Sequence, residues 1–260
     1  MSWASSRQLK YFSGLVVFLG LIIFAFIYPI IFKDSTCSDG KKNGTETGVD
    51  CGGSCSLMCK EDISAPAIAW SRAFHVTANN FNLVAFVENR NKNAGVMSAS
   101  YEFRVYDSNN KLLGRRQGTT FIPPNQQFAI FEPRFDSGES KIKSVSFEFV
   151  PNLVWVKKFP ILQTPQQSIK VNNIMLDNNK DTPNLSAIIN NNSIYDIPEF
   201  DVIAILYDAE KNAINASKTH KGTLINNGSM PVVFTWPEAL TSEPVTNEVM
   251  VLINPFSVSF

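Results

Sequence analysis

The sequence predicts an all-β protein that carries one N-terminal transmembrane helix, a short disulfide-rich loop module and two tandem β-sandwich domains. Three observations predict this architecture: an uncharged run at Tyr11–Phe32, four cysteines confined to Cys37–Cys59, and a two-residue alternation afterwards that recurs about 100 residues later. We expect a tail at 1–10, the transmembrane helix at 11–32, the cysteine module at 33–61, a first sandwich at 62–158, a linker at 159–167 and a second sandwich at 168–260.

The uncharged run has the length of a membrane span. Lys10 and Lys33 bracket 22 residues, Tyr11 to Phe32. As a helix they would extend about 33 Å, enough to cross a hydrocarbon core of about 30 Å. A cleaved signal peptide is the alternative, but its apolar region is shorter and ends in small residues, whereas this run ends in bulky ones. The pattern favours an uncleaved anchor.

The charges beside this run predict its orientation. Arg7, Lys10 and the α-amino group are positive on the N-terminal side, whereas Lys33 and Asp34 cancel on the other. Cytoplasmic flanks of membrane spans carry the excess of Lys and Arg. We therefore expect a single-pass membrane protein with a cytoplasmic N-terminus and an extracytoplasmic ectodomain.

The four cysteines predict a disulfide-closed module. Cys37, Cys51, Cys55 and Cys59 lie in a segment with too few apolar side chains to form a core. An even number of cysteines on the oxidising side of a membrane indicates two disulfides, in any of three connectivities. A zinc site is the competing interpretation, but the spacing between these cysteines does not give the C-x2-C pairs that such sites use.

Oxygen-bearing side chains interleave with glycines in the same module. They are Asp39, Asn43, Glu46 and Asp50, and calcium takes six to eight oxygen ligands from flexible loops. The alternative is a solvated loop in which these side chains cap turns. Calcium is therefore a candidate cofactor, and both readings stay open.

The module resembles a short motif that recurs in bacterial surface proteins, of the form C-x-D-G-x-x-N-G-x-E-x-G-x-D-C-G-G-x-C-x(n)-C. Every named position is present between Cys37 and Cys59. The resemblance implies an extracytoplasmic, disulfide-closed spacer and implies no reaction.

The rest of the chain repeats itself in order. Asn82–Asn89 aligns with Asn184–Asn191, and Val105–Asp107 aligns with Leu206–Asp208. Within a copy, apolar residues alternate with polar ones, as at Val145, Phe147 and Phe149, which is typical of half-buried strands. The turn-forming segments 107–110 and 208–211 predict hairpins. Together these features favour two β-sandwiches.

Both copies resemble Ig-like or fibronectin-III-like sandwiches, including the late-embryogenesis-abundant type and FxLYD-type domains. The resemblance is carried by strands that end in Asn89 and Asn191, by the Tyr-Asp turns at 106–107 and 207–208, and by a Pro/Asn/Gly corner before an apolar strand. It implies an Ig-like fold for each copy. Neither copy holds a cysteine pair, so an antibody-type domain is not indicated.

Nothing in the sequence predicts catalysis. The two histidines, His75 and His220, fall at non-equivalent positions of different copies, and no nucleophile-elbow, zincin or phosphate-loop motif is present. The formal net charge of zero argues against a nucleic-acid partner. Trp70, Trp155 and Trp236 would form a binding platform if exposed, although tryptophans in strands more often fill cores.

Two hypotheses of different classes follow. The first is a membrane-anchored, extracytoplasmic, non-catalytic envelope protein with an interaction or structural role and a protein or cell-wall partner. The alternative is a glycan- or wall-binding accessory protein, or a cryptic enzyme that acts on the wall. Sandwich folds host many functions, so the fold alone does not decide between them.

Overall fold

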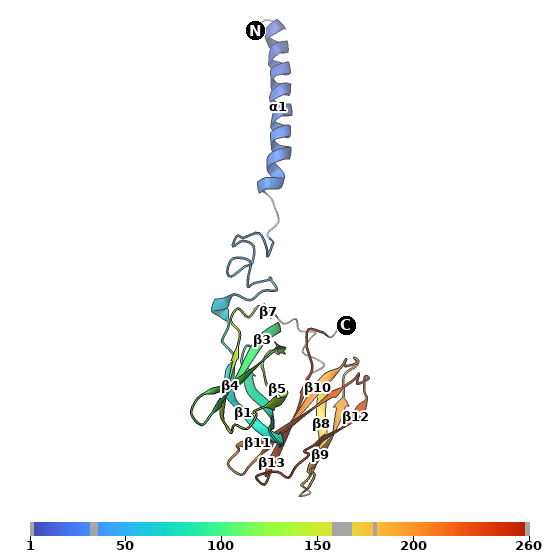
Figure 1. The fold of residues 1–260 in the computed structure, drawn as a ribbon. Coiled ribbons are helices and arrows are strands. Elements are labelled where there is room, and N and C mark those ends of the chain that lie inside the picture. The colour runs from blue at the N-terminus through green and yellow to red at the C-terminus, as the bar shows by residue number, and fades with distance from the viewer. Residues whose placement is uncertain (1–2, 32–35, 158–167, 179–180, 258–260) are drawn as a thin grey trace. The chain divides into compact units, whose positions relative to one another are not determined.

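The structure is a computed structural model that describes residues 3–31, 36–157, 168–178 and 181–257. The expected linker at 159–167 and the expected end of the membrane helix at Phe32 lie outside the described residues. Contacts divide the chain into two compact units, Met1–Cys55 and Ser56–Phe260. The described residues form one α-helix, one 3-10 turn and thirteen strands, so the expected all-β class is confirmed (Figure 1).

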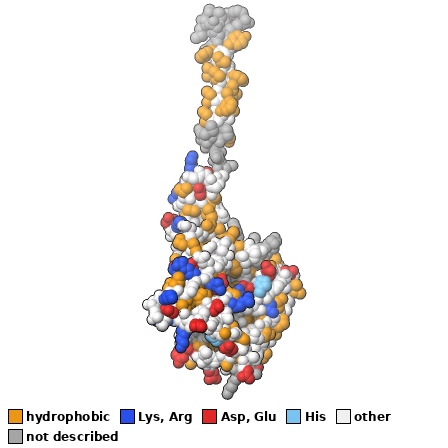
Figure 2. All heavy atoms as spheres, in the orientation of Figure 1, with side chains coloured by type: hydrophobic (Ala, Val, Ile, Leu, Met, Phe, Trp, Pro, Cys, Tyr) orange, Lys and Arg blue, Asp and Glu red, His pale blue; other side chains and the backbone are white. Residues whose placement is uncertain are grey.

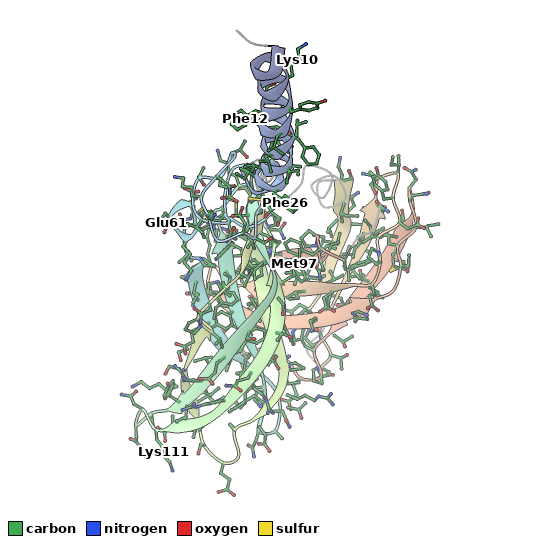
Figure 3. All side chains as sticks on the ribbon, turned by 90° about the horizontal axis from the view of Figure 1, so that it is seen from above. Lys10, Phe12, Phe26, Glu61, Met97 and Lys111 are labelled. Carbon is green, nitrogen blue, oxygen red and sulfur yellow. A yellow bond between two sulfur atoms is a disulfide. The ribbon has the colours of Figure 1, made fainter. Side chains whose placement is uncertain are left out.

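The first unit begins with helix α1 (Trp3–Ile31), which starts earlier than the sequence indicates. Its segment Lys10–Tyr28 has a mean hydropathy of 2.3 and none of it is buried in the protein. Hydrophobic side chains cover the visible face of this helix in Figure 2, and Phe12 and Phe26 project outward from it in Figure 3. The length and composition of α1 fit a membrane anchor or a signal sequence.

The cysteine module follows α1 as a series of turns and is closed by disulfides, as expected. Cys37 is bonded to Cys55. Cys51 and Cys59 are also in disulfide linkage, so no cysteine is free. The glycines permit these turns: a Cβ on Gly53, which has φ +54°, would lie 1.8 Å from the carbonyl oxygen of Thr45. Because all four sulfur atoms are in disulfides, they are not available as the zinc ligands of the competing interpretation.

The first sandwich lies in the second unit and has two sheets. One sheet has the order β1-β2-β5, and the other has the order β4-β3-β6 with β7 also paired to β3. The strands are β1 (Ala67–Thr77), β2 (Asn80–Asn89), β3 (Ala94–Asp107), β4 (Leu112–Ile122), β5 (Gln126–Asp136), β6 (Ile142–Phe149) and β7 (Trp155–Lys157). The 3-10 turn η1 (Lys60–Asp62) precedes them.

The second sandwich has sheets of order β12-β9-β8 and β11-β10-β13. Its strands are β8 (Ile169–Asp177), β9 (Asn184–Asn191), β10 (Phe200–Tyr207), β11 (Ala213–Lys221), β12 (Ser229–Thr235) and β13 (Thr246–Leu252). When β8–β13 are taken in the order of β1–β6, the two sandwiches have the same strand neighbours. The tandem repeat of one domain stays a prediction from the sequence.

Each sandwich has its own core, and the expected alternation produces it. Phe103 and Val105 of β3 are fully buried in the first core, and Leu185 and Ile189 of β9 are fully buried in the second. The expected hairpins are present as well. The β3–β4 turn is held by Asp107, whose Oδ1 accepts hydrogen bonds from the backbone N–H groups of residues 109 and 111, and Lys111 stands at its tip (Figure 3).

Candidate ligand-binding site between the sandwiches

A third hydrophobic cluster joins the two sandwiches face to face. The sheet β1-β2-β5 contributes Phe74, Val84, Phe86, Ala129 and Phe131, and the sheet β11-β10-β13 contributes Ile203, Ile205, Ala213 and Ala216. Ile203 and Ile205 are 1% and 0% exposed, and burying such a side chain contributes about 1.5–3 kcal/mol each. The two sandwiches are therefore packed directly against each other.

A second sequence pattern, different from the two-residue alternation, indicates this contact. Residues 83–87 of β2 and 202–206 of β10 are continuous apolar runs, and every residue in both runs is buried. A continuous apolar run is typical of a strand that is covered on both faces. On β10, Val202 and Leu206 enter the second core, while Ile203 and Ile205 enter the shared cluster.

Polar contacts also link the sandwiches. Arg72 of β1 donates a hydrogen bond from Nη1 to the carbonyl oxygen of Ala213, at 2.8 Å, and one from Nη2 to Oδ1 of Asn212, at 3.3 Å. Lys218 of β11 places its Nζ 5.8 Å from the ring centroid of Phe131 on β5. These side chains restrict sliding of one sandwich along the other.

A cavity of about 350 Å³ opens beside the shared cluster. This junction cavity has a volume within the usual range for small-ligand sites. Its walls come from both sandwiches, with strands β3, β4 and β5 on one side and β10, β11 and the segment after β13 on the other. The lining includes Thr119, Thr120, Phe121, Glu199, Asp201, Lys218, His220, Asn254 and Ser257.

The charged part of the cavity is a continuation of the apolar one. Asp201 lies on the same face of β10 as Ile203, and it pairs across the sheet with His220 of β11. Asp201 Oδ1 lies 2.9 Å from His220 Nδ1, and its Oδ2 accepts a hydrogen bond from Lys218 Nζ at 3.2 Å. Glu199 Oε2 lies 3.6 Å from His220 Nε2. Two carboxylates thus surround one imidazole and one ammonium group.

These contacts set the electrostatics of the cavity. The hydrogen bond to Asp201, assisted by the charge of Glu199, raises the pKa of His220 above its ordinary value. On the opposite wall, burial and a 2.6 Å hydrogen bond to Glu132 raise the pKa of Tyr101, so its hydroxyl stays a neutral donor. The cavity combines fixed donors and acceptors with an apolar floor.

The cavity does not contain an assembled nucleophile in the part of the chain that the structure describes. The Asp201–His220 pair has the geometry of an orienting carboxylate and a base. However, His220 Nε2 faces Glu199, and the Ser257 hydroxyl donates to the carbonyl oxygen of Asn254, at 3.1 Å.

The three tryptophans predicted as a candidate binding platform occupy three separate places. Trp155 and Trp236 are 9% and 4% exposed and belong to the first and second cores respectively. Trp70 is half-buried at the shared cluster, where it stacks on Phe86 with 5.5 Å between ring centroids. Because two indoles are buried and the third is packed against the junction, they do not form the common platform considered from the sequence.

Three of the four predicted oxygen donors of the cysteine module, Asp39, Glu46 and Asp50, accept hydrogen bonds within the module, whereas Asn43 Oδ1 is buried without a hydrogen-bond partner among the described residues. Asp39 accepts hydrogen bonds from the backbone N–H of Lys41 and from the Asn43 amide, and both oxygens of Asp50 lie within 3.1 Å of the Gly40 nitrogen. Glu46 accepts from the backbone N–H of Asn43 at 3.1 Å. The carboxylates of Asp39, Glu46 and Asp50 do not converge as a metal-sized group. Calcium at this module stays a prediction.

The two histidines are not brought together. His75 Nε2 lies 2.8 Å from the carbonyl oxygen of Ala78, and its Nδ1 lies 3.5 Å from Glu238. His220 lines the junction cavity with Asp201. No sequence pattern singles out Asp201, Lys218 or Glu199, because their grouping depends on strand register and on packing against the other sandwich.

Comparison with known proteins gives only distant similarities. No protein-family model matches the chain, and no curated protein matches its sequence. A red sea bream transglutaminase structure is 9% identical with a TM-score of 0.23, covering 74% of this chain and 31% of that one. A glycoside hydrolase family 2 β-glucuronidase is 10% identical with a TM-score of 0.20, covering 86% of this chain and 26% of that one.

A third similar structure is the N-terminal tandem CBM22-1–CBM22-2 domain of Xyn10C from Paenibacillus barcinonensis. It is 7% identical with a TM-score of 0.16, and the match covers 75% of this chain and 93% of that one. This chain spans less than a third of the length of the transglutaminase and of the β-glucuronidase. At such TM-scores these similarities decide neither fold nor function.

Proposed function

We propose that this chain is a non-catalytic, single-pass membrane protein of the cell envelope, and that its paired sandwiches bind a ligand in the junction cavity. The observation that carries the proposal is the cavity itself, whose walls come from two sandwiches held together by a buried apolar cluster. A site assembled this way is pre-formed, and pre-formed sites lose less entropy on binding.

The proposed location rests on two further features. Helix α1 is long and apolar enough to anchor the chain, and Arg7 and Lys10 near its N-terminal end support a cytoplasmic N-terminus under the positive-inside rule. The disulfides suit the oxidising side of a membrane. A membrane-impermeant amine reagent on intact cells should label exposed Lys111 and Lys141, and should label Lys10 only after permeabilisation. Labelling of Lys10 on intact cells would contradict this orientation.

A polar, uncharged saccharide is the ligand class that the cavity favours. Its hydroxyl and amide groups, from Thr119, Thr120, Asn254 and Ser257, line the cavity together with apolar side chains such as Phe121. The charged side chains mostly pair with one another, so an ion would have to displace an existing partner. Sugar rings present both hydroxyl groups and apolar C–H faces, which suits such a lining.

Calorimetric titration of the full-length protein with neutral oligosaccharides tests this ligand class. We expect binding that weakens about ten-fold in Asp201→Asn or Asn254→Ala, the loss that about 1.4 kcal/mol produces. Exposed Asn192→Ala is the matched control and should bind like the wild type. Equal binding by all four proteins would place the saccharide elsewhere, and binding by none would leave a protein segment as the cavity's ligand.

A further inference from the structure

The sheet β12-β9-β8 of the second sandwich has an apolar outer face. Its inner face fills the second core, and the alternate positions of each strand point the other way. Two rows of outward residues cross the centre of the sheet: Pro231, Ile188 and Asn172, then Val233, Ser186 and Met175. Met175 is 66% exposed and Val233 is 54% exposed. The centre of this outer face is therefore apolar and open to water.

The equivalent face of the first sandwich is the one that is buried at the junction. Phe86 of β2 and Phe131 of β5 point outward from the first sandwich and belong to the shared cluster. Under the alignment of the two copies and the strand register, these positions correspond to Ile188 of β9 and Val233 of β12. The second sandwich thus keeps apolar residues at positions that the first sandwich uses for sheet-to-sheet packing.

The sheet β4-β3-β6 of another copy does not supply the matching surface. In the junction the covering strand is β10, and its Ile203 corresponds to Glu102 of β3. Likewise, Ile205 corresponds to Arg104. The Glu102 carboxylate is paired with Arg104 and accepts a hydrogen bond from Gln117. Covering such ionised groups with an apolar face costs free energy of desolvation. A head-to-tail repeat of the junction between two copies is therefore unfavourable.

The charges on β8 complement each other across a two-fold axis. Lys170 pairs in register with Asn190, and Asp177 pairs with Asn184, so both charged residues belong to the outer face, one near each end of the strand. Both are exposed, and the other outward positions in the register of this sheet are uncharged. A two-fold axis perpendicular to the strands places β8 antiparallel to β8 of a second copy, and it brings Lys170 to Asp177 at both ends.

We infer that the outer face of β12-β9-β8 is the contact surface of a symmetric dimer, in which a second copy of this chain supplies the same face. A two-fold interface is self-complementary, so the apolar centre packs on itself and two Lys170–Asp177 pairs flank it. Three strands about 4.8 Å apart, with about 3.3 Å per residue, give the seven-residue length of β12 a face of about 14 by 23 Å. This area is at the small end of specific interfaces, so the dimer dissociates on dilution. The dimer does not require a ligand in the junction cavity.

The arrangement is tested first on the unaltered protein. Full-length protein is mixed with an equal amount of nitrogen-15-labelled protein in a neutral detergent, treated with a zero-length carbodiimide cross-linker and digested. We expect a Lys170–Asp177 link that joins a labelled peptide to an unlabelled one, because within one strand these residues lie about 23 Å apart. Absence of this mixed link, or links between copies only at other positions, overturns the inference.

A substitution at the centre of the face tests its location. Sedimentation equilibrium of the full-length protein in density-matched detergent gives the dissociation constant of the dimer. Met175→Lys places an unpaired charge in the apolar centre and should raise this constant at least ten-fold. Met97→Lys is the matched control, because Met97 is 57% exposed on the first sandwich. Equal constants for the wild type and both variants would assign dimerisation to another part of the chain and contradict the inference.

Charge reversal tests the direction of the strands. Lys170→Asp brings like charges together at both ends of the dimer and should weaken it about five-fold at low salt. Adding Asp177→Lys exchanges the two charges, so the double variant should dimerise like the wild type. If the second substitution does not restore the dimer, the antiparallel arrangement is wrong.

Discussion

Asn89 and Asn191 occupy equivalent positions in the two sandwiches, and each makes equivalent hydrogen bonds at the end of its own strand. Each ends the central strand of its three-stranded sheet and is at most 1% exposed. Asn89 Nδ2 donates to the carbonyl oxygens of Ala94 and Pro123, while Asn191 Nδ2 donates to those of Tyr195 and Leu224. In each sandwich one buried amide thus binds carbonyl oxygens of two separate chain segments.

Replacing either amide should destabilise the protein. Asn89→Ala removes the donor to the Pro123 carbonyl oxygen, and Asn191→Ala removes the acceptor of the buried Ser193 N–H. A buried group left unsatisfied costs about 1–3 kcal/mol. We expect a fall of about 2–4 kcal/mol in the free energy of unfolding, measured by urea denaturation. The exposed Asn192→Ala serves as control and should change stability by less than about 0.5 kcal/mol. Equal stabilities would contradict the structural role of the buried pair.

The shared cluster should make the two sandwiches unfold together. Ile205 is fully buried in that cluster, so Ile205→Ala should cost about 2–5 kcal/mol. Because the lost packing belongs to both sandwiches, hydrogen exchange should accelerate in β2 and β5 of the first as well as in β10. Val233→Ala, on the exposed face of β12, is the control. Faster exchange confined to residues 168–257 would show that the sandwiches are independent.

Local features of the fold were predictable, because short-range rules govern them. The alternation at Phe147 and Phe149 predicted strand β6, and Asp107 predicted the hairpin after β3. Burial by neighbours was less predictable. Glu102 sits at a position expected to face solvent, yet it is 5% exposed because Arg104 and Gln117 cover it. The alternation predicts which face of the sheet a side chain lies on, but it does not predict which neighbouring side chains cover it.

The candidate site could not be read from the sequence for the same reason. Thr119 and Asp201 line one cavity although they belong to different sandwiches. The continuous apolar run at residues 202–206 indicates a strand covered on both faces, but it does not identify the covering surface. Packing between distant segments therefore creates the site, and no spacing motif encodes it.

Acidification should strengthen the contacts at His220. Its folded-state pKa is raised, chiefly by the hydrogen bond to Asp201, so the stabilisation is fully present below the unfolded-state pKa and is lost as pH rises through the folded-state value. Lys218 and Glu199 are the other charged groups around it. Because His220 is 61% exposed, the gain should not exceed about 1 kcal/mol.

The comparison of wild type with His220→Gln isolates this effect. The difference in melting temperature between the two proteins should grow as pH falls from about 8 to about 5.5, a range that spans the ordinary histidine pKa of about 6.5. A titration of the His220 ring protons by NMR gives the folded-state pKa directly. A difference that stays constant with pH would remove His220 from the account.

Calcium should have little effect on the cysteine module if its carboxylates only cap turns. Asp39, Glu46 and Asp50 each accept backbone hydrogen bonds and do not converge. We therefore expect equal amide exchange at residues 36–55 in millimolar calcium and in chelator. Slower exchange with calcium at these residues would establish a binding site there, since a ligand of the native state stabilises it.

Photo-crosslinking from the junction cavity tests whether a ligand binds there in the cell. A benzophenone side chain placed at exposed, cavity-lining Thr119 in the full-length protein is irradiated on intact cells that make it, and adducts are analysed by mass spectrometry. The account predicts a reproducible adduct from Thr119 that Asp201→Asn diminishes, and none of the same kind from Val233 on the far sheet. The same adduct from Val233, or one indifferent to Asp201→Asn, would contradict ligand binding in the cavity.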